Sequence, residues 1–309
     1  HDSDTDGSVT FSIAFSDSSG NAGTAVTAVT NGSSVTYDDT VPTLTSVGIA
    51  SNNATTTLAA AGDIVTLTLT ASETIGTPTV TFFSGGAAIN DGTIDYVNTG
   101  GNTWTAKYTA NSSDTDGSVT FSIAFSDTVG NAGTAVTAVT DGSSVTFDDS
   151  VPTLTSVGIA SNNSTATLAK EGDVVTLTLT ASETIGTPTV TFQSGGAAIT
   201  NSVTYANPSD NNWTAAYTTH DSDTDGSVTF SIAFSDSTGN AGVAVTAVTD
   251  GSSVTYDDTV PTLTSVGIAS NNSTTTLAKE GDIVTLSFTA NETIGTPTVT
   301  FQSGGAAIT

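Results

Sequence analysis

Residues 119–126 read VTFSIAFS, with a large apolar residue at every second position. Side chains two positions apart point to the same side of an extended strand, so this pattern predicts a β-strand with one buried and one solvated face. Residues 64–71 (IVTLTLTA) and 103–109 (TWTAKYT) alternate in the same way. No segment shows a helical period, and the sequence therefore predicts an all-β fold.

Turn signals rich in Gly, Asp and Asn separate these runs, as at Gly62-Asp63 and Asp116-Gly117. They divide about 110 residues into seven expected strands, at 43–50, 64–71, 78–83, 93–97, 103–109, 118–126 and 134–147. Seven short alternating strands are typical of an immunoglobulin-like β-sandwich. A closed barrel is the main alternative.

The heptapeptide VPTLTSV occurs three times, at 41–47, 151–157 and 260–266. A period near 110 residues is the length of a domain and not of a solenoid repeat. We therefore expect tandem domains in an extended array, with the C-terminal part of one repeat at 1–39, complete repeats at 40–149 and 150–258, and the N-terminal part of another at 259–309. The chain opens with His1 and shows no signal peptide, and we expect it to be an internal part of a longer protein.

The composition excludes several classes of function. The 30 acidic residues against three basic ones give a formal net charge of −27, which would repel nucleic acid and anionic membranes. No apolar run is long enough to insert into a membrane. The absence of Cys rules out disulfides and the usual zinc sites, and two His leave no general base to pair with a nucleophile, so we do not expect an enzyme. Alternating apolar residues, at 36% hydrophobic content, argue against disorder.

Several short segments resemble the bacterial immunoglobulin-like domain families, and the resemblance covers the whole chain. They are DTVPT at 39–43, AKEGD at 169–173, ASETI at 181–185, WTAKY at 104–108, DTDG at 114–117 and SDTVGN at 126–131. The resemblance implies tandem repeats of giant secreted or surface proteins, many of them adhesins, and an extracellular location. It also implies calcium, since several related arrays bind it between domains.

The acidic hexapeptide DSDTDG occurs at 2–7 and 221–226, and SSDTDG takes its place at 112–117. Alternate carboxylates followed by a Gly let side-chain oxygens converge around a cation at a sharp turn. The segment is not an EF-hand, because the twelfth position from Asp2 is Ile13 and a strand follows where a helix would be needed. In the alternative interpretation, each Asp only caps its turn by bonding to nearby backbone.

Sandwich topology brings these turns together with other acidic loops. The turn after the fifth strand and the end of the seventh lie at one pole, and the loops after the second and sixth strands lie at the other. Stacked repeats would then gather carboxylates at each junction, and Ca²⁺ prefers six to eight such oxygens. We therefore predict Ca²⁺ at three junctions: Asp4, Asp6, Asp38, Asp39, Glu73 and Asp127 at the first, Asp114, Asp116, Asp148, Asp149, Glu183 and Asp236 at the second, and Asp223, Asp225, Asp257, Asp258 and Glu292 at the third.

Three functions are compatible with these features. The first is an extracellular adhesin stalk, whose partners within this segment are neighbouring repeats of the same chain. The second is a subunit segment of an extracellular filament, sheath or surface layer, assembled through contacts with other copies. In the third, the repeats themselves bind a ligand, although their short loops give this little support.

Overall fold

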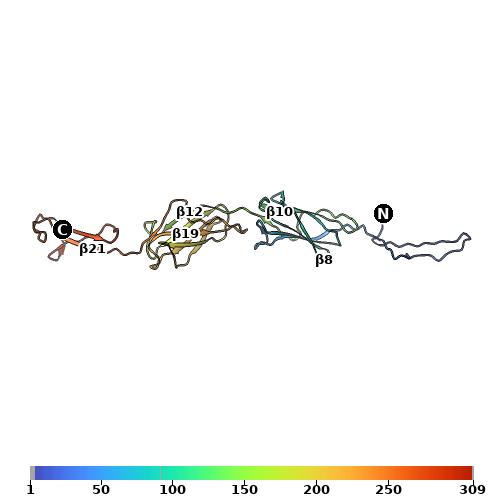
Figure 1. Ribbon diagram of the computed structural model, residues 1–309, viewed down its shortest axis with the longest axis horizontal. Helices are drawn as coiled ribbons and strands as arrows, with labels where there is room; N and C mark the ends of the chain where they lie inside the picture. Colours follow the sequence, from blue (N-terminus) through green and yellow to red (C-terminus); the bar gives the residue numbers. More distant parts are fainter. Residues whose placement is uncertain (1–3, 91, 308–309) are drawn as a thin grey trace. The chain divides into compact units, whose positions relative to one another are not determined.

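The computed structural model describes residues 4–90 and 92–307. All the regular secondary structure in these ranges is β-strand. The prediction of an all-β fold is confirmed (Figure 1). No helix capable of crossing a membrane is found among the described residues. The chain forms two compact units: a first unit of residues 1–153, 181–188 and 233–244, and a second unit of residues 154–180, 189–232 and 245–309.

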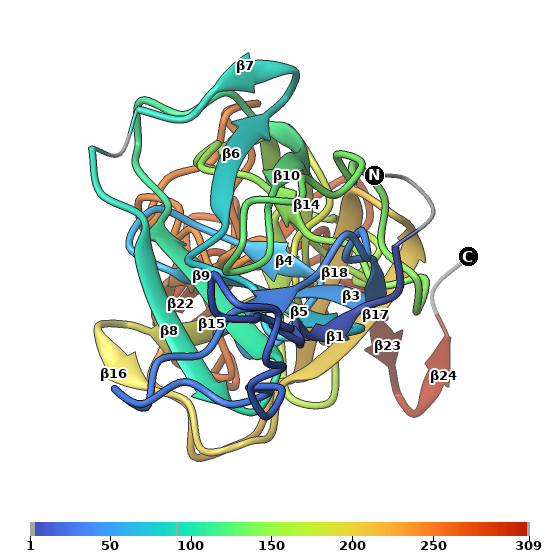
Figure 2. The same ribbon diagram turned by 90° about the vertical axis from the view of Figure 1, so that its right-hand side faces the viewer.

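Two sheets form the sandwich of the first unit. One has the order β3-β5-β9-β8, with bounds Leu44–Ser51, Ile64–Ala71, Thr103–Thr109 and Asp95–Gly100. The other has the order β4-β11-β10-β6-β7, with bounds Leu58–Ala59, Thr146–Phe147, Gly117–Ala124, Thr79–Ser84 and Ala87–Ala88. Figure 2 shows β6 and β7 as one hairpin.

This strand order identifies the fold. Of the seven expected strands, the first, second, fifth and fourth lie side by side in one sheet, and the third, sixth and seventh lie in the other. That distribution defines the immunoglobulin-like sandwich, and it excludes a single closed barrel. The prediction of immunoglobulin-like sandwiches is confirmed.

The alternating residues form the interior between the two sheets. Val119, Phe121 and Ile123 on β10 are at most 6% exposed, and Leu67 and Leu69 on β5 are fully buried. The rings of Phe82 and Tyr108 lie 4.8 Å apart between centroids, one from each sheet. Burial of these side chains is the main favourable contribution to folding, because it removes apolar surface from water.

The second unit contains the same pair of sheets. The order β12-β14-β18-β17 joins strands Leu154–Ser161, Val174–Ala181, Asn212–Thr218 and Thr204–Ser209. The order β13-β20-β19-β15-β16 joins Leu168–Ala169, Thr255–Tyr256, Gly226–Ala233, Thr189–Ser194 and Ala197–Ala198. Its aromatic pair, Phe192 and Tyr217, has a centroid distance of 4.9 Å. Near-identical sequence thus gives the same topology twice.

The remaining strands form two-stranded ladders without an opposing sheet. They are β1 with β2 (Gly7–Ser8, Thr36–Tyr37), β21 with β22 (Leu263–Ser270, Val284–Ala290) and β23 with β24 (Gln302–Ser303, Ala306–Ala307). Val9, Phe11 and Ile13, which correspond to the buried residues of β10, are 57%, 40% and 52% exposed. They are exposed because no counterparts of β5, β6 and β9 cover them in the described residues.

The seventh strand differs from its expected extent of 134–147. Only the bridge between Ile123 and Val136 and the two residues of β11 are strand-like. Between them the chain bonds to β3 instead: the Thr140 N–H donates to Val47 O (2.8 Å), and Thr140 Oγ1 accepts the Val47 N–H (2.9 Å). The Ile49 N–H likewise donates to Ser143 Oγ (2.8 Å). Alternation could not show this, because hydroxyl side chains replace backbone as acceptors here. The short strands β4 and β7 were also not predicted.

These hydroxyl bonds generate a test of the fold. Thr140→Val keeps the side-chain shape but leaves the Val47 N–H, on a fully buried residue, without its acceptor. Losing that bond costs roughly 1–2 kcal/mol, so the Val47 amide should exchange its hydrogen about five- to thirtyfold faster. Native-state hydrogen exchange measures this rate. Thr68→Val, at an exposed strand position, is the control, and equal exchange in both variants would contradict the assigned role.

Candidate cation sites

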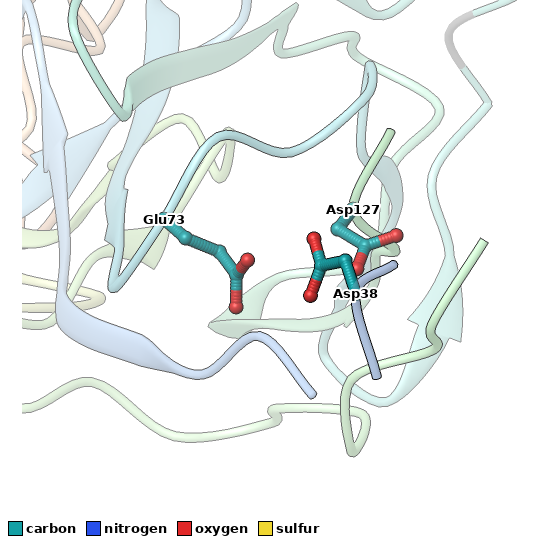
Figure 3. Close-up of side chains that lie close together, drawn as sticks. All are labelled: Asp38, Glu73 and Asp127. Carbon is teal, nitrogen blue, oxygen red and sulfur yellow. The ribbon is translucent and has the colours of Figure 1, made fainter. Parts of the chain in front are cut away.

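Two clusters of three carboxylates lie in the first unit. In the first cluster, Asp38, Glu73 and Asp127 each offer an oxygen, and the three oxygens lie within 4.8 Å of one another. The second cluster brings Asp148, Glu183 and Asp236 together in the same way. Figure 3 shows the side chains of the first cluster converging from three separate segments.

The fold places the three members of each cluster by joining two loops to a linker. Asp38 directly follows β2, Glu73 follows β5, and Asp127 follows β10. A bridge between Ile75 and Asp127, with a bond from the Gly76 N–H to Ser126 O (2.9 Å), holds the last two loops together. The second cluster has the same bridge between Ile185 and Asp236.

Asp127 is held rigidly by its own loop. Its Oδ1 accepts the backbone N–H groups of Val129, Gly130 and Asn131 at 2.6–2.9 Å, and its Oδ2 accepts Asn131 Nδ2 (2.8 Å). Burial opposes ionisation of Asp127, but these bonds outweigh it and lower its pKa, with the Asn131 side chain contributing most. The loop thus presents a preorganised carboxylate, and Asp236 accepts the corresponding four bonds.

Two Asn residues join these loops to the linker, and the sequence analysis missed them. Asn131 Nδ2 also donates to the backbone carbonyl of Asp38 (3.0 Å), and Asn240 Nδ2 donates to that of Asp148 (2.8 Å). The signal available in the sequence was the recurring Gly-Asn pair, three and four residues after each loop Asp. Its role across the linker could be seen only once the loops were placed in space.

Glu73 is the member of its cluster whose ionised form is least stabilised. Its Oε1 is buried and has no hydrogen-bond partner in the structure. Desolvation raises the pKa of Glu73, and the negative charges of Asp38, Asp127 and Asp6 raise it further. The pKa of Glu183 is raised for the same reasons, by burial and then by Asp148, Asp236 and Asp116. Each cluster therefore resists full ionisation unless a positive charge joins it.

The donor set fits a hard divalent cation. Oxygen ligands stand about 2.4 Å from Ca²⁺, so two ligands on opposite sides of one ion lie about 4.8 Å apart. Oxygens within 4.8 Å of one another can therefore share a single ion. Asp6, Asp38 and Glu73 also line a surface pocket with Thr40 and Ser72, through which a cation could reach the cluster from solvent.

The Asp at the fifth position of each acidic hexapeptide anchors the linker. The Asp6, Asp116 and Asp225 carboxylates each accept one linker N–H and one linker hydroxyl. The N–H donors are Asp39 (3.0 Å), Asp149 (2.9 Å) and Asp258 (2.9 Å), and the hydroxyl donors are Thr40, Ser150 and Thr259. These bonds lower the pKa of Asp6, led by the Thr40 hydroxyl, and that of Asp225, led by the Asp258 N–H.

The Asp at the third position of the hexapeptide caps its own turn in the two later copies. Asp114 is 8% exposed and accepts the N–H groups of Asn90 (2.8 Å) and Asn111 (3.0 Å), and Asp223 accepts that of His220 (2.9 Å). Asp4 interacts electrostatically with Tyr37. The structure therefore shows turn-capping and linker bonds for the hexapeptide carboxylates, and the three-carboxylate clusters use other residues.

The linker carboxylates have separate bonds. The first of each pair, Asp38, Asp148 and Asp257, accepts the N–H two residues later, at 3.0–3.1 Å. The second residues, Asp39, Asp149 and Asp258, accept the Tyr37 hydroxyl (3.0 Å), the Ala61 N–H (3.3 Å) and the Glu171 N–H (3.4 Å) respectively. In the second unit Glu292 Oε1 is buried without a partner, but no cluster of three carboxylates forms among its described residues.

Comparison with known proteins adds no family. No family model matches the chain, and no curated protein matches it. Among solved structures, a three-domain titin fragment, a variant of I67–I69, is 11% identical over 87% of this chain and 81% of its own, with a TM-score of 0.39. The I9–I11 tandem of titin is 11% identical over 82% and 78%, with a TM-score of 0.31. The fold assignment rests on the strand order and not on these low scores.

The raised pKa of Glu73 gives a test with a definite sign. A carboxyl whose folded-state pKa is raised stabilises the fold at pH values below its unfolded pKa, and that contribution is lost as the pH rises through the folded value. In chelator at neutral pH, Glu73→Gln should therefore raise the midpoint of thermal unfolding. The gain should fade as the pH is lowered below the ordinary pKa of a Glu carboxyl, because the carboxyl then holds its proton in the folded and the unfolded state alike. Glu280→Gln, at an exposed position outside the clusters, is the control, and an equal gain there would contradict the interpretation.

Proposed function

We propose that this chain is part of an extracellular structural stalk of the adhesin type, in which Ca²⁺ bound at the three-carboxylate clusters stiffens successive repeats. The observation that supports this most is recurrence. The same trio of one linker Asp, one Glu and one loop Asp meets twice, at 38, 73 and 127 and at 148, 183 and 236.

A bound cation would change the mechanics of the linker. Asp38 precedes the first complete repeat, whereas Glu73 and Asp127 belong to loops within it. An ion shared by all three ties the linker to those loops, and it removes the repulsion among carboxylates that have no Lys or Arg in their cluster. The array would then be stiff with Ca²⁺ and more flexible without it.

The repeats themselves suit a spacer. Each sandwich has its own apolar interior, and an eight-residue strand such as β5 spans roughly 26 Å at about 3.3 Å per residue. Each further repeat therefore adds length to the array without requiring a different fold. The resemblance to bacterial immunoglobulin-like repeats supports an extracellular, cell-surface location, and the sequence offers no nucleophile paired with a general base that would favour catalysis.

Calcium binding is tested by thermal unfolding with and without the metal. A ligand at 100 times its dissociation constant stabilises the folded state by about 2.7 kcal/mol per site. The wild-type chain should therefore unfold at a higher temperature in Ca²⁺ than in chelator. The double variant Glu73→Gln with Glu183→Gln should lose this shift, because each cluster loses one ligand.

Glu280→Gln serves as the matched control and should keep the full calcium shift. A wild-type chain with no calcium shift would contradict the proposal. So would a shift of equal size in the double variant, since the ion would then bind elsewhere.

Assembly into a filament or surface layer is the second candidate, and exposed apolar faces favour it. Val9, Phe11 and Ile13 are exposed near one end of the sequence, and Val299 and Phe301 are 42% and 37% exposed near the other. In the complete repeat the corresponding residues pair as Phe121 with Phe82 and Ile123 with Val80. A second copy could therefore cover these faces, although the counterpart of residues 201–219 would still be missing.

Sedimentation in Ca²⁺ separates the two candidates. A stalk segment should remain a monomer over a wide range of concentrations. A filament subunit should form larger species as the concentration rises, and Phe11→Ser should reduce them. Concentration-independent monomers would exclude the filament.

A further inference from the structure

We propose that successive repeats also make a direct contact that needs no metal: the turn after the first strand of one repeat holds the tip of the loop after the sixth strand of the next. We call these segments the AB turn (residues 51–63) and the FG tip (residues 236–240). The inference rests on the proposed function in that it assumes a structural array, and it names which surfaces of the repeats meet.

Asn53 makes the contact from the AB turn. Its side-chain amide donates to Asp63 Oδ2 (2.8 Å) within the turn and to the backbone carbonyl of Thr238 in the FG tip (2.9 Å). Its Oδ1 accepts the Thr55 N–H (3.0 Å), which fixes the orientation of the amide, and its own N–H donates to Ser51 Oγ (3.0 Å). The bonds to Asp63 and Thr55 thus fix the amide within the turn, with its second N–H directed at the FG tip.

Two loops of the same construction show what the contact covers. The loop at 127–131 and the FG tip at 236–240 wrap the same way around their Asp carboxylates. Yet Thr238 is 4% exposed, whereas its counterpart Val129 is 61% exposed. The AB turn of Asn53 meets the FG tip at Thr238, and no AB turn meets Val129 among the described residues. The difference in burial marks the FG tip as a surface that an AB turn covers.

The FG tip is held from two sides. Its Thr238 carbonyl accepts from Asn53, while Asn240 Nδ2 donates to the linker carbonyl of Asp148. Both acceptors are backbone carbonyls, so neither bond uses a cluster carboxylate or a bound ion as its acceptor. Because the bond is made to a backbone carbonyl, it does not depend on the side chain at the tip, which is Thr238 in one repeat and Val129 in another.

The other AB turns are prepared for the same partner. Asn163 Nδ2 donates to Asp173 Oδ2 (2.8 Å), and Asn272 Nδ2 donates to Asp282 Oδ2 (2.8 Å). By the repeat pattern, the FG tip corresponding to Asn163 would lie beyond residue 309. Among the described residues, the bond to an FG tip is thus seen for Asn53 and not for Asn163 or Asn272, which keep the bond within their own turns.

This pairing supplies a matched experiment. Because the chain has no Cys, spin labels can be attached at Thr120→Cys and Thr229→Cys, two exposed strand positions in different repeats. The distribution of distances between the labels, measured by pulsed electron spin resonance in chelator, reports how freely the repeats move. Asn53→Ala and Asn163→Ala each remove the same bond within a turn, but only Asn53→Ala removes the bond to Thr238.

In chelator, Asn53→Ala should broaden the distance distribution, and Asn163→Ala should leave it as narrow as in the parent. Equal widths in the two variants would overturn the proposed contact. Because the measurement excludes metal, its outcome is independent of the calcium test: a calcium site can fail while the contact holds, and the reverse.

Discussion

Burial of alternate side chains between two sheets is the constraint on which the rest of the structure depends. Val119, Phe121 and Ile123 on β10 can be dry only if β5 and β9 lie opposite, and that requirement fixes the strand order. The strand order in turn places the loops after β5 and β10 side by side at one end of the sandwich. Packing of the apolar strand residues therefore also brings the acidic residues of these loops together.

Hydrogen bonds within the loops offset part of the repulsion between these like charges. Asp127 is stabilised in its ionised form by backbone N–H groups, whereas Glu73 is left with a buried oxygen that nothing satisfies. One carboxylate is thus stabilised as an anion and another is destabilised as one, and a cation bound as proposed would stabilise the ionised form of both. The bonds of Asn131 and Asn240 to the linker hold the geometry without charge.

The sequence was sufficient for the fold and for part of the site. Period-two alternation in residues 64–71 and 119–126 predicted the strands, and sandwich topology predicted that Asp38, Glu73 and Asp127 would converge. It could not separate these from Asp6 and Asp114, because composition does not reveal whether a carboxylate faces a cation or a backbone N–H. The interruption of the seventh strand at Thr140 and Ser143 could not be predicted for a similar reason. Hydroxyl groups there replace backbone pairing without changing the apolar pattern.

The central proposal is that three carboxylates share one ion, and a crystal structure of the chain grown with Ca²⁺ tests this directly. The account predicts one ion at each cluster, with oxygens of Asp38, Glu73 and Asp127 about 2.3–2.6 Å from the first. Carboxylates that remain apart in saturating Ca²⁺, with no ion between them, would contradict it.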